Sequence, residues 1–254
     1  MNTLTLNAGR ITALGRSELT LLVRNRATLT LALLMPLMMV FILRSSLGDS
    51  EGAQTVGEAT LTGGIGMVLL LVVHMNLVSS YVARREELVL KRLRTGEASD
   101  VEILSGTALP AAALALAQIA VLAVAGAAVL DVAVPRNPLL ILVAVLAGVL
   151  LLAALSAVTS SFTRTVETAG LTTLPLFLVS VLGSGMFAPV DSLPDAVARV
   201  CELMPLSGVM TLVRVGWSGG AAGGDLLGAG LTTLAWIVIS VFAVQRWFRW
   251  EPRR

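Results

Sequence analysis

The chain has 254 residues, of which 56% are hydrophobic and only 13% are charged. Soluble domains carry about 25% charged residues, so this composition excludes an ordinary water-soluble domain and indicates a protein whose solvent is lipid. The formal net charge of +2 is too small to suggest a nucleic-acid-binding protein, and the single cysteine, Cys201, excludes an internal disulfide and a multi-cysteine metal site.

The N-terminal segment, residues 1–26, is basic and amphipathic. Apolar residues such as Leu14 and Leu22 interleave there with Arg10, Arg16 and Arg24. This pattern predicts a helix that lies in the cytoplasmic membrane interface.

Six windows of the sequence are long, apolar and free of Asp, Glu, Lys and Arg. A bilayer core about 30 Å thick needs roughly 20 such residues in a helix. The windows are residues 27–43, 60–83, 103–130, 137–163, 168–190 and 226–245. The first contains Pro36, which a kinked membrane span tolerates. We therefore expect an all-α integral membrane protein with about six transmembrane helices, and residues 27–250 form one transmembrane domain.

The positive charges predict the orientation of these spans. All Lys and Arg residues except Arg44, Arg136, Arg199 and Arg214 fall on the side that holds both termini. Since cytoplasmic loops carry the excess of Lys and Arg, we expect both termini, including the short tail 251–254, in the cytoplasm, and the chain in the cytoplasmic (inner) membrane.

Residues 191–225 are less apolar than a span but too hydrophobic for a free loop. Pro194 and Pro205 divide this segment, and Ser192 with Asp195 has the spacing of a capping box. We expect two short re-entrant helices in the outer leaflet before the last span.

The loop after the second window, residues 84–96, is the most informative segment. Glu87 and Lys91 form a favourable i, i+4 pair, and Val89 shares a face with Leu93, which predicts one short amphipathic helix. Physical reasoning alone leaves two interpretations equally open, a coupling element and a basic loop on the membrane surface.

Two stretches carry a resemblance to a known family. The run from Glu86 to Arg94, followed by Thr95-Gly96, resembles the cytoplasmic loop of ABC-2 type transporter permeases, in particular the daunorubicin-resistance-like exporters of actinobacteria. The outer motif is similar to that family's segment before the last span; it comprises Phe187, Pro189, Leu193, Pro194 and Pro205.

The resemblance implies a permease half-transporter that pairs with a second permease copy and docks on an ATP-binding cassette subunit. The residues implied in this coupling are Glu87, Leu88, Lys91, Arg92, Leu93 and Arg94. The sequence contains no phosphate-binding Gly-x-x-x-x-Gly-Lys-Ser/Thr motif, so ATP and Mg are expected on the separate subunit, and the chain is expected to be no enzyme and to bind no cofactor or metal of its own.

The cargo implied is a hydrophobic or amphiphilic, drug-like or antibiotic-like compound. Export of a lipid or a lipid-linked glycan is an alternative, and a non-transporting membrane anchor or sensor is another.

Polar residues inside the spans are candidates for a substrate path. They are His74, Asn76 and Gln118. Hydrogen bonding between helices is the favoured interpretation of these residues. Ser184 between two glycines, with His74 elsewhere, has the outline of an intramembrane serine protease, but small residues in a span more often mark close helix packing.

Overall fold

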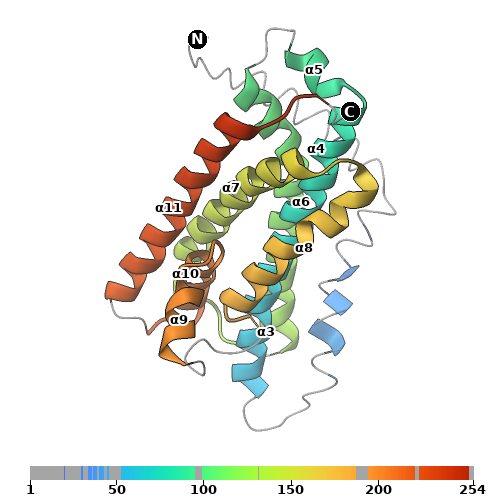
Figure 1. The fold of residues 1–254 in the computed structure, drawn as a ribbon. Coiled ribbons are helices and arrows are strands. Elements are labelled where there is room, and N and C mark those ends of the chain that lie inside the picture. Colours follow the sequence, from blue (N-terminus) through green and yellow to red (C-terminus); the bar gives the residue numbers. More distant parts are fainter. Residues whose placement is uncertain are drawn as a thin grey trace.

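The computed structural model describes residues 53–94, 99–130, 132–186, 194–220 and 223–251, together with a few single positions before residue 53. Every regular element in these ranges is a helix (Figure 1). In chain order they are α3 (Ala53–Val68), η1 (Leu69–Met75), α4 (Asn76–Glu86), α5 (Val89–Arg94), α6 (Asp100–Val129), α7 (Pro138–Phe162), α8 (Val166–Gly183), α9 (Asp195–Glu202), α10 (Ser207–Ser218) and α11 (Gly223–Trp247). The expected interfacial helix 1–26 and most of the first expected span, 27–43, lie outside the described residues.

Five helices in this part of the chain are long and apolar enough to cross a membrane. They are Val56–Glu86, which joins α3, η1 and α4, and then α6, α7, α8 and α11. α9 and α10 bend by 93° at a short break, and counting this pair as one span gives six crossings. The expectation of an all-α membrane protein is therefore confirmed.

One expected span is shorter in the structure. The window 168–190 predicted a helix up to residue 190, but α8 ends at Gly183. Gly185 follows with a φ of 68°, a left-handed conformation that glycine adopts without steric cost and that terminates a helix.

The bundle has two distinct ends. α5 and the C-terminal end of α11 lie at one end, and α9 and α10 lie at the other (Figure 1). The end that holds α9 and α10 is held together by backbone contacts: the amide of Arg136 donates to the carbonyl of Trp217 at 3.1 Å, and that of Asn137 donates to the carbonyl of Gly216 at 2.8 Å. These bonds attach the loop before α7 to the end of α10.

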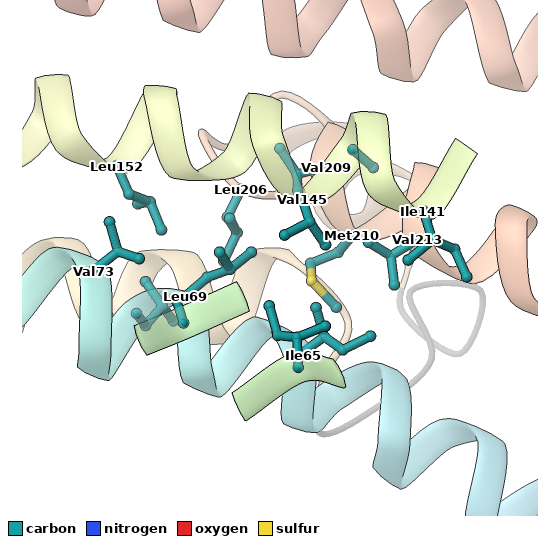
Figure 2. Packing of buried hydrophobic residues seen from close by; sticks show 14 of the residues in the cluster. Ile65, Leu69, Val73, Ile141, Val145, Leu152, Leu206, Val209, Met210 and Val213 are labelled. Carbon is teal, nitrogen blue, oxygen red and sulfur yellow. The ribbon is translucent and has the colours of Figure 1, made fainter. Parts of the chain in front are cut away.

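The core surrounds α7, which packs against α10, α11 and the second span. Figure 2 shows buried side chains from three parts of the chain pointing toward one another. They are Ile65, Leu69 and Val73 from the second span, Ile141, Val145 and Leu152 from α7, and the N-cap residue Leu206 with Val209, Met210 and Val213 from α10. Gly148 permits the close approach, because a Cβ there would lie 3.0 Å from Val209 and 3.1 Å from Leu69. Close van der Waals packing of this kind holds helices together in lipid, where the hydrophobic effect does not drive helices to associate.

The second span is not a uniform α-helix. Its middle, Leu69–Met75, is a π-helix, and its flanking residues Val68 and Asn76 keep ordinary helical dihedrals. π-Helical turns inside α-helices occur frequently at functional sites.

Candidate functional site

The segment after the second span folds as two helices joined by a tight turn. α4 ends at Glu86, Glu87 caps it, and α5 begins at Val89. The amide of Leu88 donates to the carbonyl of Arg85 at 3.1 Å, which closes the turn. The prediction of one amphipathic helix containing both Glu87 and Lys91 is therefore wrong: Glu87 belongs to the α4–α5 turn (residues 87 and 88), so the two are not an i, i+4 pair on a continuous helix.

Leu88 has an unusual backbone conformation. Its φ is 60°, and it is the only non-glycine residue with positive φ among the described residues. The left-handed conformation costs an L-residue such as leucine about 1–2 kcal/mol. Strain of this kind persists only where neighbouring structure imposes it, and it concentrates at functional sites.

Exposed side chains on the turn and on α5 present a mixed apolar and charged surface. Glu87 and Arg92 are exposed, and Leu88 is 40% exposed. Leu93 is half-buried, whereas the side chains of Lys91 and Arg94 lie outside the described residues. Four of these six residues belong to α5 and the other two form the turn before it, so the expected coupling residues lie in one short segment.

Leu90 anchors this segment to the bundle. Its side chain is fully buried, in contrast to Leu88 two residues earlier. The sequence analysis did not single out Leu90, because a leucine in an amphipathic run carries no mark that distinguishes a buried anchor from an exposed contact.

Arg85 fixes the end of α4 from inside the protein. The side chain is only 1% exposed, and its guanidinium donates to the carbonyls of Ser160 at 2.7 Å and Thr163 at 2.5 Å. Both carbonyls belong to the C-terminus of α7, where backbone acceptors lack the usual amide partner four residues later and the helix dipole favours a positive charge. Sequence reasoning had counted Arg85 only as one of the positive charges on the cytoplasmic side.

α6 holds the last turns of α4 from the other side. The hydroxyl of Tyr81 donates to the carbonyl of Leu104 at 3.1 Å, and Arg84 donates to the hydroxyl of Thr107 at 3.4 Å. The base of the α4–α5 turn is thus bonded to both α6 and α7.

A capping box begins α6 where the chain returns from this segment. The amide of Ser99 donates to the buried Glu102 carboxylate at 2.8 Å, and the amide of Glu102 donates to the Ser99 hydroxyl at 3.3 Å. Both ends of the α4–α6 connection are therefore defined by specific hydrogen bonds.

The three polar candidates for a substrate path are not gathered at one site. His74 is buried in η1, with Nδ1 3.1 Å from the hydroxyl of Ser156 on α7. Asn76 is exposed, and Gln118 is buried on α6. The contact of His74 is the interhelical hydrogen bond that the sequence analysis favoured.

The protease arrangement does not form. The hydroxyl beside His74 belongs to Ser156, and the carbonyl of Ser184 accepts from Arg214 at 2.7 Å. Ser184 is thus the C-cap of α8, beside Arg214.

The outer motif is partly described. Phe187, Pro189 and Leu193 lie outside the described residues, as does Ser192. Pro194 is the N-cap of α9, so a Ser192 cap for this helix was the wrong prediction. Pro205 is buried in the break between α9 and α10, where it cannot continue a helix from α9.

Comparison with known proteins identifies the family. No curated protein matches the chain. The family profile of the ABC-2 type transporter matches residues 9–217, which covers most of the chain and includes the second span, the α4–α5 turn and the bent pair α9–α10. The chain belongs to the ABC-2 type transporter family and is therefore the permease component of an ABC transporter.

Proposed function

We propose that the chain exports a hydrophobic or amphiphilic, drug-like or antibiotic-like compound across the cytoplasmic membrane, as the daunorubicin-resistance-like exporters do. Family membership implies association with an ATP-binding cassette subunit. In this proposal that subunit docks on the α4–α5 turn and α5, binds ATP and Mg, and moves two permease copies relative to each other.

The observation that carries the proposal is the exposed, strained Leu88 beside a buried anchor. Leu90 and Arg85 hold the turn in place, and the turn presents an apolar side chain between Glu87 and Arg92. An apolar contact surrounded by charges suits a protein partner, because the apolar group supplies binding free energy and the charges orient the complex.

The distribution of positive charge supports a cytoplasmic location for the turn. At the end of the bundle that holds α5, the described cations include Arg84, Arg164, Arg246 and Arg249; at the opposite end the described cations are Arg136, Arg199 and Arg214. The run Lys91-Arg92 and Arg94 adds to the α5 end. The side with more Lys and Arg is the cytoplasmic side.

Partly exposed helices support pairing with a second copy. α8 and α11 leave most of their surface exposed in the single chain. α8 carries Gly170 on this surface, where a Cβ would meet nothing within 4 Å. Small residues on an exposed membrane helix allow another helix to approach closely.

The test is the coupling of ATP hydrolysis to Leu88. Full burial of a leucine contributes about 1.5–3 kcal/mol, so burial of the 40% that is exposed contributes about 0.6–1.2 kcal/mol. Leu88→Asn retains a residue that tolerates positive φ but removes the apolar contact. We expect about three- to eightfold weaker binding of the ATP-binding subunit in liposomes and a matching loss of stimulated ATP hydrolysis.

Two further variants distinguish the loss of the Leu88 contact from a loss of permease stability. Leu88→Gly relieves the backbone strain and also removes the side chain, so it should weaken coupling without destabilising the permease. Leu203→Asn makes the same chemical change at a 65% exposed leucine at the opposite end and should leave coupling intact. If both Leu88 variants bind and stimulate the ATP-binding subunit normally, the turn is not the docking contact, and a membrane anchor or sensor becomes the better interpretation.

A further inference from the structure

A small open cavity lies between the C-terminal ends of α7 and α11. Its volume is about 260 Å³, and its described lining residues are Ser161, Phe162, Trp247 and Arg249. Both aromatic residues expose more than half of their surface, 56% for Phe162 and 57% for Trp247. The cavity is smaller than the roughly 300–1,000 Å³ of pockets for drug-sized ligands, which argues against the exported compound as its occupant.

The chain after α11 is held firmly across the end of α7. The amide of Arg249 donates to the hydroxyl of Ser161 at 3.4 Å, and this hydroxyl donates to the carbonyl of Ala157 at 3.1 Å. Phe248 packs edge-on against Tyr81 of α4, with ring centroids 6.2 Å apart, and against Trp250, at 4.8 Å. Arg249 is therefore flanked by two anchored aromatic residues and has a defined position beside the cavity.

The lining is mainly apolar and has one charged residue, a combination that suits the surface of a membrane. α7 ends at Phe162 and α11 at Trp247, so the aromatic rings lie where the hydrocarbon region gives way to headgroups. Arg249 adds a guanidinium, whose fork of donors matches a phosphate. The occupant therefore has an apolar body and an anionic head.

Charge near the cavity favours an anion over the chain's own N-terminal segment. Arg164 and Arg246 lie within three positions of lining residues along the chain, and the acids within five positions are Glu167 and Glu251. The N-terminal segment 1–26 carries four arginines and one glutamate, so its docking beside Arg249 would bring like charges together.

We infer that this cavity binds the headgroup of an anionic phospholipid, with its phosphate on Arg249 and its glycerol region between Phe162 and Trp247. The inference concerns a lipid that stays bound to the permease and is independent of the compound exported. A bound lipid would join α11 to α7 at the level of Tyr81, one helical turn before Arg85.

Native mass spectrometry of the full chain tests this site. The purified chain is delipidated and given equal amounts of phosphatidylglycerol and phosphatidylcholine. We expect one phosphatidylglycerol retained per chain, preferred about fivefold over phosphatidylcholine. Arg249→Gln should abolish this preference. Arg246→Gln should keep it, because this substitution removes the same charge near the same helix end at a residue that does not line the cavity.

Several outcomes would overturn the inference. Equal retention of both lipids by the unaltered chain would mean that the cavity does not select a headgroup. Equal losses in the two arginine variants would mean that diffuse surface charge, and no specific site, attracts the lipid. Displacement of the lipid by glycerol 3-phosphate would identify a site for a soluble phosphate. The first and third measurements use the unaltered chain, so they decide the question even if a variant fails to fold.

Discussion

Replacing the buried Arg85 should destabilise the permease more than replacing its neighbour does. The guanidinium donates two hydrogen bonds to the carbonyls of Ser160 and Thr163. Hydrogen bonds from a charged group contribute about 1.5–3 kcal/mol each, and desolvation of the guanidinium offsets part of their sum. We therefore expect Arg85→Met, which keeps the length of the side chain, to lower the free energy of unfolding by about 2–4 kcal/mol. Arg85→Lys, which can reach one carbonyl, should lose about half as much.

Arg84→Met is the matched control for this prediction. Arg84 is half-buried, and its bond to the hydroxyl of Thr107 is longer, 3.4 Å. Its replacement should cost less than about 1 kcal/mol. The assay is SDS titration of the purified chain in detergent micelles, with helical circular dichroism as the signal. If the two methionine variants unfold at the same SDS fraction, the bonds of Arg85 to α7 do not stabilise the fold, and the argument that they hold the α4–α5 turn is wrong.

The same unfolding assay checks two further predictions. Gly208→Val should destabilise the permease by about 1–3 kcal/mol, because a Cβ there would lie 2.5 Å from the carbonyl oxygen of Ala229. Gly228→Ala is the control: its Cβ would meet nothing within 4 Å, so it should be neutral or stabilising. Equal effects of the two variants would show that α10 and α11 are not in close contact. Ser156→Ala should cost about 0.5–1.5 kcal/mol by removing the partner of His74, and unchanged stability would mean that this interhelical hydrogen bond makes no net contribution.

The spans could be predicted from sequence because lipid leaves the backbone few choices. A segment that crosses the hydrocarbon must satisfy its own hydrogen bonds, so a long apolar window is already a helix prediction. α7 shows how closely local signals can place a boundary: Asn137 accepts from the amide of Leu140 at 3.0 Å, and Pro138 occupies the first turn. The expected window 137–163 differs from this helix only at its flanking residues.

The detail of the α4–α5 turn, the expected coupling segment, could not be predicted in the same way. Leucine has no preference for positive φ, so nothing in the local sequence distinguishes Leu88 as the residue that turns the chain. Its conformation depends on contacts from elsewhere: Leu90 is buried in the bundle, and Arg85 reaches carbonyls 75 and 78 positions further along. The local pattern, Glu87 four residues before Lys91, favoured a continuous helix, and tertiary packing prevailed over it.

The candidate substrate path shows a different limit. Polarity inside a span identified His74, Asn76 and Gln118, but polarity does not reveal which way a side chain faces. The structure buries two of the three residues and exposes Asn76. The π-helical segment that contains His74 also had no sequence signal, since its residues Leu69–Met75 are ordinary apolar residues apart from the histidine.

The position of Arg85 has a consequence for biogenesis. Two of its acceptors lie at the end of α7, two spans later, so the arginine leaves the ribosome at least 75 residues before these acceptors. At about 5–20 residues per second this interval lasts about 4–15 s. Throughout that time α7 cannot hold the guanidinium, and in the proposed topology its positive charge can then help to orient the newly inserted second span. Only after α7 has entered the membrane can the same side chain be desolvated, so one arginine serves insertion first and the folded permease afterwards.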